Sequence, residues 1–363
     1  MEKPLVLLIH GMGTHQPGAI TDEFQKGLAE SAKFLGIEDF NASDEFEFDE
    51  FNYSEFLDDW RNQHANHAQA ITDAMLAGPS FLNRILSFQA KLANDEFLYT
   101  HWLDVFVYCV LDTVRVEVTA QLMAKLMTIL KAAKDDNDNP REVIFVAHSL
   151  GTALLHDTLD LLYVGSGGEP DTTHTIRYVN YPIDGLWMVA NVSRLTHILT
   201  RLRDPEHSIV RDNSVSHDGI CTGFYPVFNE FDPFTLIKRY KVEPVFGELI
   251  RTKDFRRLSD GWVNPHDFGE YMSDPSVGGV FLDTHSSHDI SLQQLRDAMA
   301  SYRHTTLSGN ASSKYKAIKK AIADIEHAID QGASKTQKVI LLMELYEHFK
   351  EAYDLLKSGF AKR

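Results

Sequence analysis

The stretch from Val143 to Gly151 reads Val-Ile-Phe-Val-Ala-His-Ser-Leu-Gly, and a helix-like stretch, Thr152 to Leu162, follows at once. An apolar strand that turns sharply into a helix with a serine at the apex exposes the hydroxyl at the end of a sheet. The usual pattern is Gly-x-Ser-x-Gly, and Ala147 stands at its first position, the mildest departure from glycine. The pattern predicts Ser149 as a nucleophile, against the alternative that it only caps the following helix.

Strand patterns and helix patterns alternate outward from this turn. Strands are predicted over Leu5–Ile9, Phe46–Tyr53, Gly185–Val192 and Phe224–Glu230, with a last one over Gly278–Asp283. Helical spacing covers Ile20–Leu35 and Ile290–Tyr302. This alternation predicts an α/β fold, with a mostly parallel sheet flanked by helices.

Two segments depart from the alternation. From residue 56 to 134 the pattern is mainly helical, longer than a normal crossover, and we expect an insertion or cap over the sheet. Two amphipathic helices, Tyr315–Asp330 and Lys335–Lys357, form the tail. We therefore expect a main domain over residues 1–310 and a helical hairpin over 311–363, which covers the main domain or supports a homodimer.

Composition and net charge limit the binding partners and the cellular compartment that we expect. The 363 residues carry a net charge of −17, which disfavours nucleic acid and anionic lipid. Two cysteines, Cys109 and Cys221, allow no disulfide framework. The apolar run Leu5–Ile9 is too short for a secretion signal, and no later run suits a membrane span. The expectation is a cytoplasmic protein.

Ligands of such sheets bind beyond the carboxyl ends of the strands. A serine there needs a base, a group that orients the base, and donors for the oxyanion. The candidate donors are the N–H of Leu150 and a backbone N–H in His10-Gly11-Met12-Gly13, with Gly11 and Met12 foremost. The strand exit and the serine turn thus predict one site.

These two motifs resemble those of an α/β-hydrolase of the lipase/esterase kind. The resemblance covers about Leu5 to Tyr302, interrupted by the helical insertion, and leaves out the family's usual first two strands and the helical tail. It implies a catalytic triad in the chain order Ser, acid, His.

The acid of that triad is expected at Asp232. Its Asp232-Pro233 dipeptide follows a predicted strand and resembles the acid loop of many members, with Asp184 and Asp204 in reserve.

The histidine has two candidate loops. His266 lies in Asn264-Pro265-His266-Asp267-Phe268-Gly269-Glu270-Tyr271, which resembles the His-x-x-x-x-Tyr loop of some bacterial members. His285, with His288, follows the last predicted strand, where topology places the base. The local motif favours His266, with His285 as the alternative.

No cofactor or metal is expected. His64/His67 and His285/His288 are spaced as metal ligands can be, but no cysteine pairs and no His-Glu-x-x-His helix accompany them. Gly165-Ser166-Gly167-Gly168 lacks the Lys-Ser/Thr ending of a phosphate-binding loop.

The leading hypothesis is a serine hydrolase that cleaves small-molecule or lipid carboxylic esters through an acyl-enzyme. Acyl transfer or thioester cleavage on the same triad is the second hypothesis, since fold does not choose among these reactions. A non-catalytic scaffold that acts through the tail is the third.

Overall fold

The structure is a computed structural model that describes residues 2–11, 16–53, 105, 108–109, 112–135, 141–163, 176–177, 180–200, 202–213, 219–229, 232–236, 250–252, 266–302 and 309–361. Most of the predicted insertion over residues 56–134 lies outside this set. Its described part is mainly the long helix α7, Asp112–Asp135.

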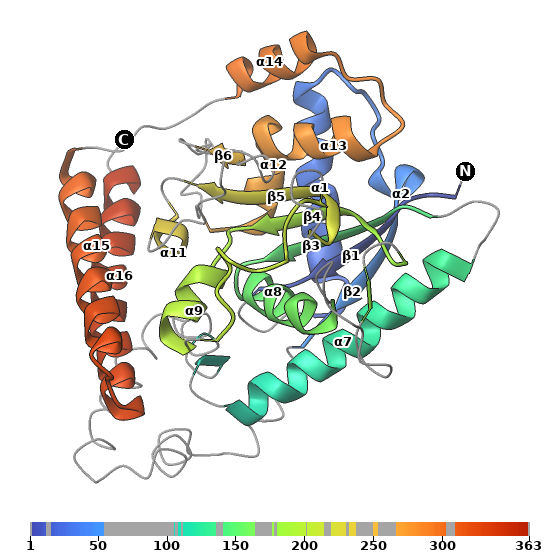
Figure 1. Ribbon diagram of the computed structural model, residues 1–363. Helices are drawn as coiled ribbons and strands as arrows, with labels where there is room; N and C mark the ends of the chain where they lie inside the picture. The colour runs from blue at the N-terminus through green and yellow to red at the C-terminus, as the bar shows by residue number, and fades with distance from the viewer. Residues whose placement is uncertain are drawn as a thin grey trace.

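Within the described residues, one sheet of six strands, in the order β2-β1-β3-β4-β5-β6, forms the centre of the fold (Figure 1). All neighbouring strands are parallel. The strands are β1 Leu5–Ile9, β2 Glu47–Phe51, β3 Val143–His148, β4 Ile183–Val189, β5 Cys221–Asn229 and β6 Ile250–Thr252. The predicted α/β class, with a parallel sheet flanked by helices, is confirmed.

Helices cover both faces of the sheet, because side chains alternate along each strand. On β1, Leu7 and Ile9 join one buried cluster with α7, α8, α9 and the tail, whereas Val6 and Leu8 join another with α1, α12, α13 and α14. The remaining helices are α1 Ala19–Phe34, α2 Ala42–Glu45, α8 Leu150–Leu162, α9 Ser193–Thr200, α11 Pro233–Leu236, α12 Phe268–Ser273, α13 Val280–His285 and α14 Leu292–Ser301.

The strand predicted over Gly278–Asp283 is wrong. This stretch forms the π-helix η1, Pro275–Gly279, and then α13. The Asp274 side chain accepts the N–H of Ser276 and caps the turn. Gly278 packs so closely that an added Cβ would lie 2.0 Å from the Met272 carbonyl oxygen. The last strand in the described residues is instead the short β6, which borders β5.

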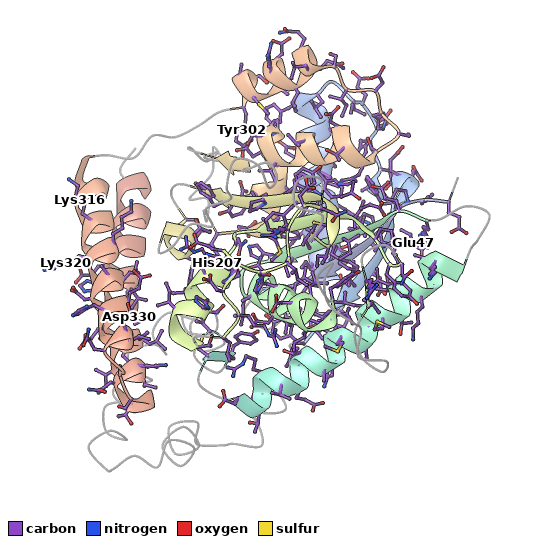
Figure 2. The ribbon with its side chains drawn as sticks, in the orientation of Figure 1. Glu47, His207, Tyr302, Lys316, Lys320 and Asp330 are labelled. Atoms are coloured by element: carbon purple, nitrogen blue, oxygen red, sulfur yellow. The ribbon has the colours of Figure 1, made fainter. Side chains whose placement is uncertain are left out.

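The tail forms the predicted helix pair, α15 Gly309–Asp330 and α16 Lys335–Ala361. Its buried side chains, such as Ile325 and Leu342, join the core cluster, and both helices contact α11 (Figure 1). Lys316 and Lys320 point away from the sheet (Figure 2). The main domain therefore covers the apolar face of the pair, and a homodimer through it stays a prediction. Within the described ranges, no helix is long and apolar enough to cross a bilayer.

Candidate active site

Ser149 lies at a sharp turn between β3 and α8, with φ 55° and ψ −126°. Such backbone angles cost about 1–3 kcal/mol and persist only where surrounding contacts impose them. Here the Ser149 N–H donates to the Val189 carbonyl at 2.9 Å, and the Ser149 carbonyl accepts the Thr152 N–H at 2.9 Å and hydroxyl at 2.6 Å. The Ser149 side chain makes no capping hydrogen bond to α8, so the capping alternative does not account for its hydroxyl.

Small residues allow this turn to pack against β1. A Cβ on Gly151 would lie 2.4 Å from the His10 carbonyl oxygen, and one on Gly11 would lie 2.7 Å from Ser149 Cβ. Real Cβ atoms essentially never approach so closely, so both positions require glycine. Ala147 is fully buried, and the site accommodates its methyl group.

His266 and Asp232 continue from the serine in a line of hydrogen bonds. Ser149 Oγ lies 2.7 Å from His266 Nε2, and His266 Nδ1 lies 2.8 Å from Asp232 Oδ2. An ionised carboxylate can only accept, so the imidazole proton belongs on Nδ1 and Nε2 is left to accept the serine proton. Ser149 and Asp232 are fully buried, and His266 is 2% exposed. The structure thus brings Ser149, Asp232 and His266 together. The expectation that the turn exposes the serine hydroxyl is wrong for the described residues, because Ser149 is buried there.

Asp232 owes its orientation to the helix that it caps. Its Oδ1 accepts the Phe234 N–H at 2.9 Å, at the start of α11. Pro233 opens that helix, where a proline loses no helical hydrogen bond. The Phe234 ring lies 4.4 Å from the His266 ring, centroid to centroid. The segment that carries Asp232 therefore also packs against the ring of His266.

His266 is fixed to the serine turn by its backbone. Its carbonyl accepts the His148 Nε2–H at 2.9 Å. The next residue, Asp267, caps α12 by accepting the Glu270 N–H at 3.0 Å. Burial raises the pKa of Asp267. Sequence reasoning did not identify this use of His148.

Tyr271 adds a contact to the acid that the sequence motif alone did not assign. Its hydroxyl donates to Asp232 Oδ2 at 2.8 Å, the same oxygen that accepts from His266. Its own oxygen accepts the Asn229 N–H at 2.8 Å. Burial, and next the charge of Asp232, raise the pKa of Tyr271 well above its ordinary value.

Of the predicted oxyanion donors, Leu150 and Gly11 lie in the described part of the chain. Leu150 is the first residue of α8, where backbone N–H groups have no partner within the helix. Gly11 packs on Ser149, and its carbonyl accepts from the Tyr53 hydroxyl at 2.7 Å and His10 Nδ1 at 2.6 Å. Met12 lies outside the described residues. The sequence did not predict that His10 and Tyr53 both bind the Gly11 carbonyl.

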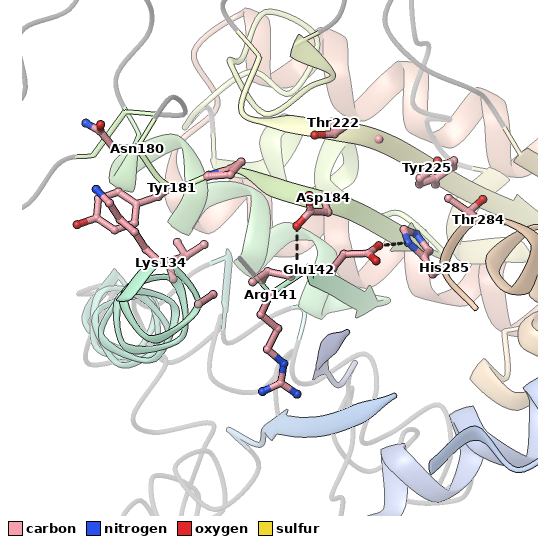
Figure 3. Close-up of a pocket in the computed structure, with 15 residues that line it drawn as sticks. Lys134, Arg141, Glu142, Asn180, Tyr181, Asp184, Thr222, Tyr225, Thr284 and His285 are labelled. Carbon is pink, nitrogen blue, oxygen red and sulfur yellow. Dashed lines mark hydrogen bonds and ion pairs between the residues drawn. The ribbon is translucent and has the colours of Figure 1, made fainter. Parts of the chain in front are cut away.

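His285 lies at the opposite edge of the sheet, near the amino ends of β3 and β4. Its Nδ1 donates to Glu142 Oε1 at 2.6 Å, and its Nε2 accepts the Trp187 indole N–H at 3.0 Å. Glu142 and His285 line a pocket of about 660 Å³. Figure 3 shows their contact among the residues that line it. Both ring nitrogens are thus used structurally, and the structure does not bring His285 to Ser149.

The reserve acids are also elsewhere. Asp184 lines the same cavity as Glu142, and its Oδ2 accepts the Val143 N–H at 2.8 Å. Burial raises the pKa of Asp184, and the hydrogen bond from the Val143 N–H opposes this rise. Asp204 pairs with exposed His207 at 2.7 Å (His207 is labelled in Figure 2). Neither contacts His266.

Of the two candidate metal pairs, only His285 and His288 lie in the described part of the chain, and no third ligand is grouped with them there. His288 lies 3.7 Å from Glu45. Across the described ranges, no three His, Cys, Asp or Glu side chains are grouped as metal ligands would be. His64 and His67 lie outside those ranges.

The chain matches no protein-family model, no curated protein sequence and no solved structure. What the site does is therefore inferred from the contacts of its own residues.

Proposed function

We propose that this protein is a serine hydrolase of the α/β-hydrolase kind that cleaves carboxylic esters through Ser149, His266 and Asp232. One observation carries the proposal, the line of hydrogen bonds from Ser149 Oγ to His266 Nε2 at 2.7 Å and from His266 Nδ1 to Asp232 Oδ2 at 2.8 Å. A serine hydroxyl is a weak nucleophile at neutral pH, and such a base with its orienting acid is what activates it.

The reaction follows from these contacts. His266 Nε2 takes the proton as Ser149 Oγ attacks the ester carbonyl, and the imidazolium returns it to the departing alcohol. A water then attacks the acyl-serine with His266 again as base. The Leu150 N–H and the backbone at Gly11 and Met12 are the proposed donors to the oxyanion, and in comparable sites the loss of one such donor raises the barrier by about 2.7–4 kcal/mol.

The substrate we propose is a small-molecule or lipid ester. Phe234 and Phe268 are buried beside the rings of His266 and His148, which favours an apolar group near the reacting carbonyl. Cys109 and Cys221 are free thiols, which fits the proposed reducing, cytoplasmic location.

Turnover of a chain-length series of nitrophenyl esters tests this function in the full-length protein. Ester cleavage by the wild type should vanish in Ser149→Ala. The matched control is Ser31→Ala, which removes a buried hydroxyl that makes no hydrogen bond, in α1. Cleavage that persists in Ser149→Ala would reject the proposal.

The same assay separates the alternatives. With an alcohol or thiol acceptor added, acyl transfer that outcompetes hydrolysis would identify an acyltransferase, and preference for acyl thioesters would identify a thioesterase. An inert wild type would favour a scaffold that acts through α15 and α16.

A further inference from the structure

We propose that Tyr271 is a positioning residue of this site, which holds Asp232 with Oδ2 directed at His266 Nδ1. The inference rests on the proposed function, because it assigns Tyr271 a role in activating Ser149. Tyr271 touches neither the serine nor the base through a hydrogen bond that the structure describes, so it acts through the acid.

The Asp232 carboxylate is fully buried and is held at both oxygens. Oδ1 accepts the Phe234 N–H at 2.9 Å, and Oδ2 accepts both His266 Nδ1–H and the Tyr271 hydroxyl, each at 2.8 Å. Without Tyr271, the only described donor to Oδ2 would be the imidazole that Asp232 has to orient. The Tyr271 hydroxyl holds Oδ2 independently of His266 and so opposes rotation of the carboxylate about its Cβ–Cγ bond.

The direction of the Tyr271 proton is set by its neighbours. The Asn229 N–H donates to the Tyr271 oxygen at 2.8 Å, so the hydroxyl proton is left to point at Asp232. Burial, and next the nearby Asp232 charge, raise the pKa of Tyr271 well above its ordinary value. The hydroxyl therefore stays a donor over the whole pH range in which a histidine works as a base.

The backbone of Tyr271 lies on a closely packed helix. It lies on α12, which packs against α1 so closely that a Cβ on Gly27 would lie 2.6 Å from Met272 Cβ. The Asn229 that contacts Tyr271 is the last residue of β5, three positions before Asp232. Tyr271 thus links the histidine-bearing segment to the strand that delivers the acid.

Tyr271→Phe tests this role, because it removes the hydroxyl and keeps the ring. We expect kcat for ester cleavage to fall about ten- to a hundredfold with KM nearly unchanged, since a hydrogen bond to a charged acceptor is lost. The low-field proton resonance of His266 Nδ1–H should also move further downfield, because Oδ2 then accepts from one donor instead of two.

The matched control is Tyr163→Phe. Tyr163 is equally buried, and its hydroxyl donates to the Tyr181 carbonyl at 2.7 Å, away from the site. This control should lower the melting temperature and leave kcat and the Nδ1 resonance unchanged. A Tyr271→Phe enzyme with the kcat and resonance of the wild type would overturn the role, as would equal losses of kcat in the two variants at a temperature where both are folded.

The failure of this inference is distinguishable from failure of the proposed function. The Nδ1 resonance reports the Asp232–His266–Tyr271 geometry without any substrate, and turnover by the wild type reports the function. An active wild type with an unaffected Tyr271→Phe variant rejects only the positioning role. An inactive wild type rejects the function and with it the role.

Discussion

Two buried histidines lie at opposite edges of the sheet, and each is hydrogen-bonded through Nδ1 to a carboxylate. The carboxyl edge is the one formed by the carboxyl ends of the strands, and the amino edge is formed by their amino ends. At the carboxyl edge, His266 bonds Asp232 at 2.8 Å, and at the amino edge His285 bonds Glu142 at 2.6 Å. The difference lies at Nε2. His266 Nε2 faces the Ser149 hydroxyl, whereas His285 Nε2 accepts the Trp187 indole N–H.

This difference shows what makes a histidine–carboxylate pair a candidate base. The pair itself only fixes the tautomer and the orientation of the ring. An indole N–H is a donor with no proton to give up in a reaction, so it locks His285 as a structural acceptor. A serine hydroxyl on a strained turn is the partner whose proton a base can take.

The largest effect should separate the two histidines. His266→Ala should lower kcat for ester cleavage on the order of 10⁶-fold, as loss of a triad histidine does. His285→Ala is the matched variant and should keep the turnover of its folded fraction, because its ring lies at the other edge. Steady-state kinetics at a temperature where both are folded make the comparison, and equal losses would contradict it.

The two carboxylates should differ by a smaller factor. Asp232→Asn should lower kcat on the order of 10⁴-fold, because the amide favours the wrong imidazole tautomer. Glu142→Gln should leave kcat within about twofold, as for a change at a partly exposed position outside the site. If Glu142→Gln proved the more damaging of the two, the assignment of edges would be reversed.

Breaking the Nε2 contact at the amino edge should affect stability alone. Trp187→Phe removes a fully buried indole and leaves His285 Nε2 without its donor. We expect a loss of about 1–3 kcal/mol in the free energy of unfolding by denaturant, with unchanged kcat. A selective loss of kcat at full stability would show that this edge takes part in the reaction.

The smallest expected effect is a pH dependence of stability that arises from Glu23, which lies near Asp267, the residue after His266. Burial, and next the charge of Asp267, raise the pKa of Glu23 to about 7, while Lys26 opposes the shift. Because the folded pKa exceeds the unfolded value of 4.5, the folded protein binds the extra proton, and stability is lost as the pH rises from 4.5 through about 7.

Glu23→Gln removes this titration. Its melting temperature should therefore exceed that of the wild type by a margin that grows between pH 5 and pH 8. Gln25→Ala, which removes a side chain that does not titrate from the same helix, is the control and should give no growing margin. A constant margin for Glu23→Gln would contradict the raised pKa of Glu23.

The sequence predicted the parts of the site that carry local signals. The apolar run into Ser149 predicted the turn, Asp232-Pro233 predicted a stiff acid loop, and the His266 motif located the histidine that the structure brings to Ser149. These signals sit within a few residues of the side chain concerned. Together they predicted Ser149, Asp232 and His266 as one site.

The parts that depend on tertiary contacts were missed. Gly278–Asp283 reads as a strand, because a short apolar run cannot be told from a buried helix by pattern alone. Its helical form depends on the Asp274 cap and the close approach of Gly278 to Met272. That misread strand gave His285 its apparent place after the last strand, whereas the three-residue β6 is too short to show in a pattern.

Labelling with a fluorophosphonate, followed by mass spectrometry of the modified peptide, tests the central claim most directly. The account predicts one adduct, on Ser149, that is absent in Ser149→Ala, greatly slowed in His266→Ala and formed at the wild-type rate in His285→Ala. An adduct that persists in Ser149→Ala, or one that depends on His285 and not on His266, would contradict it.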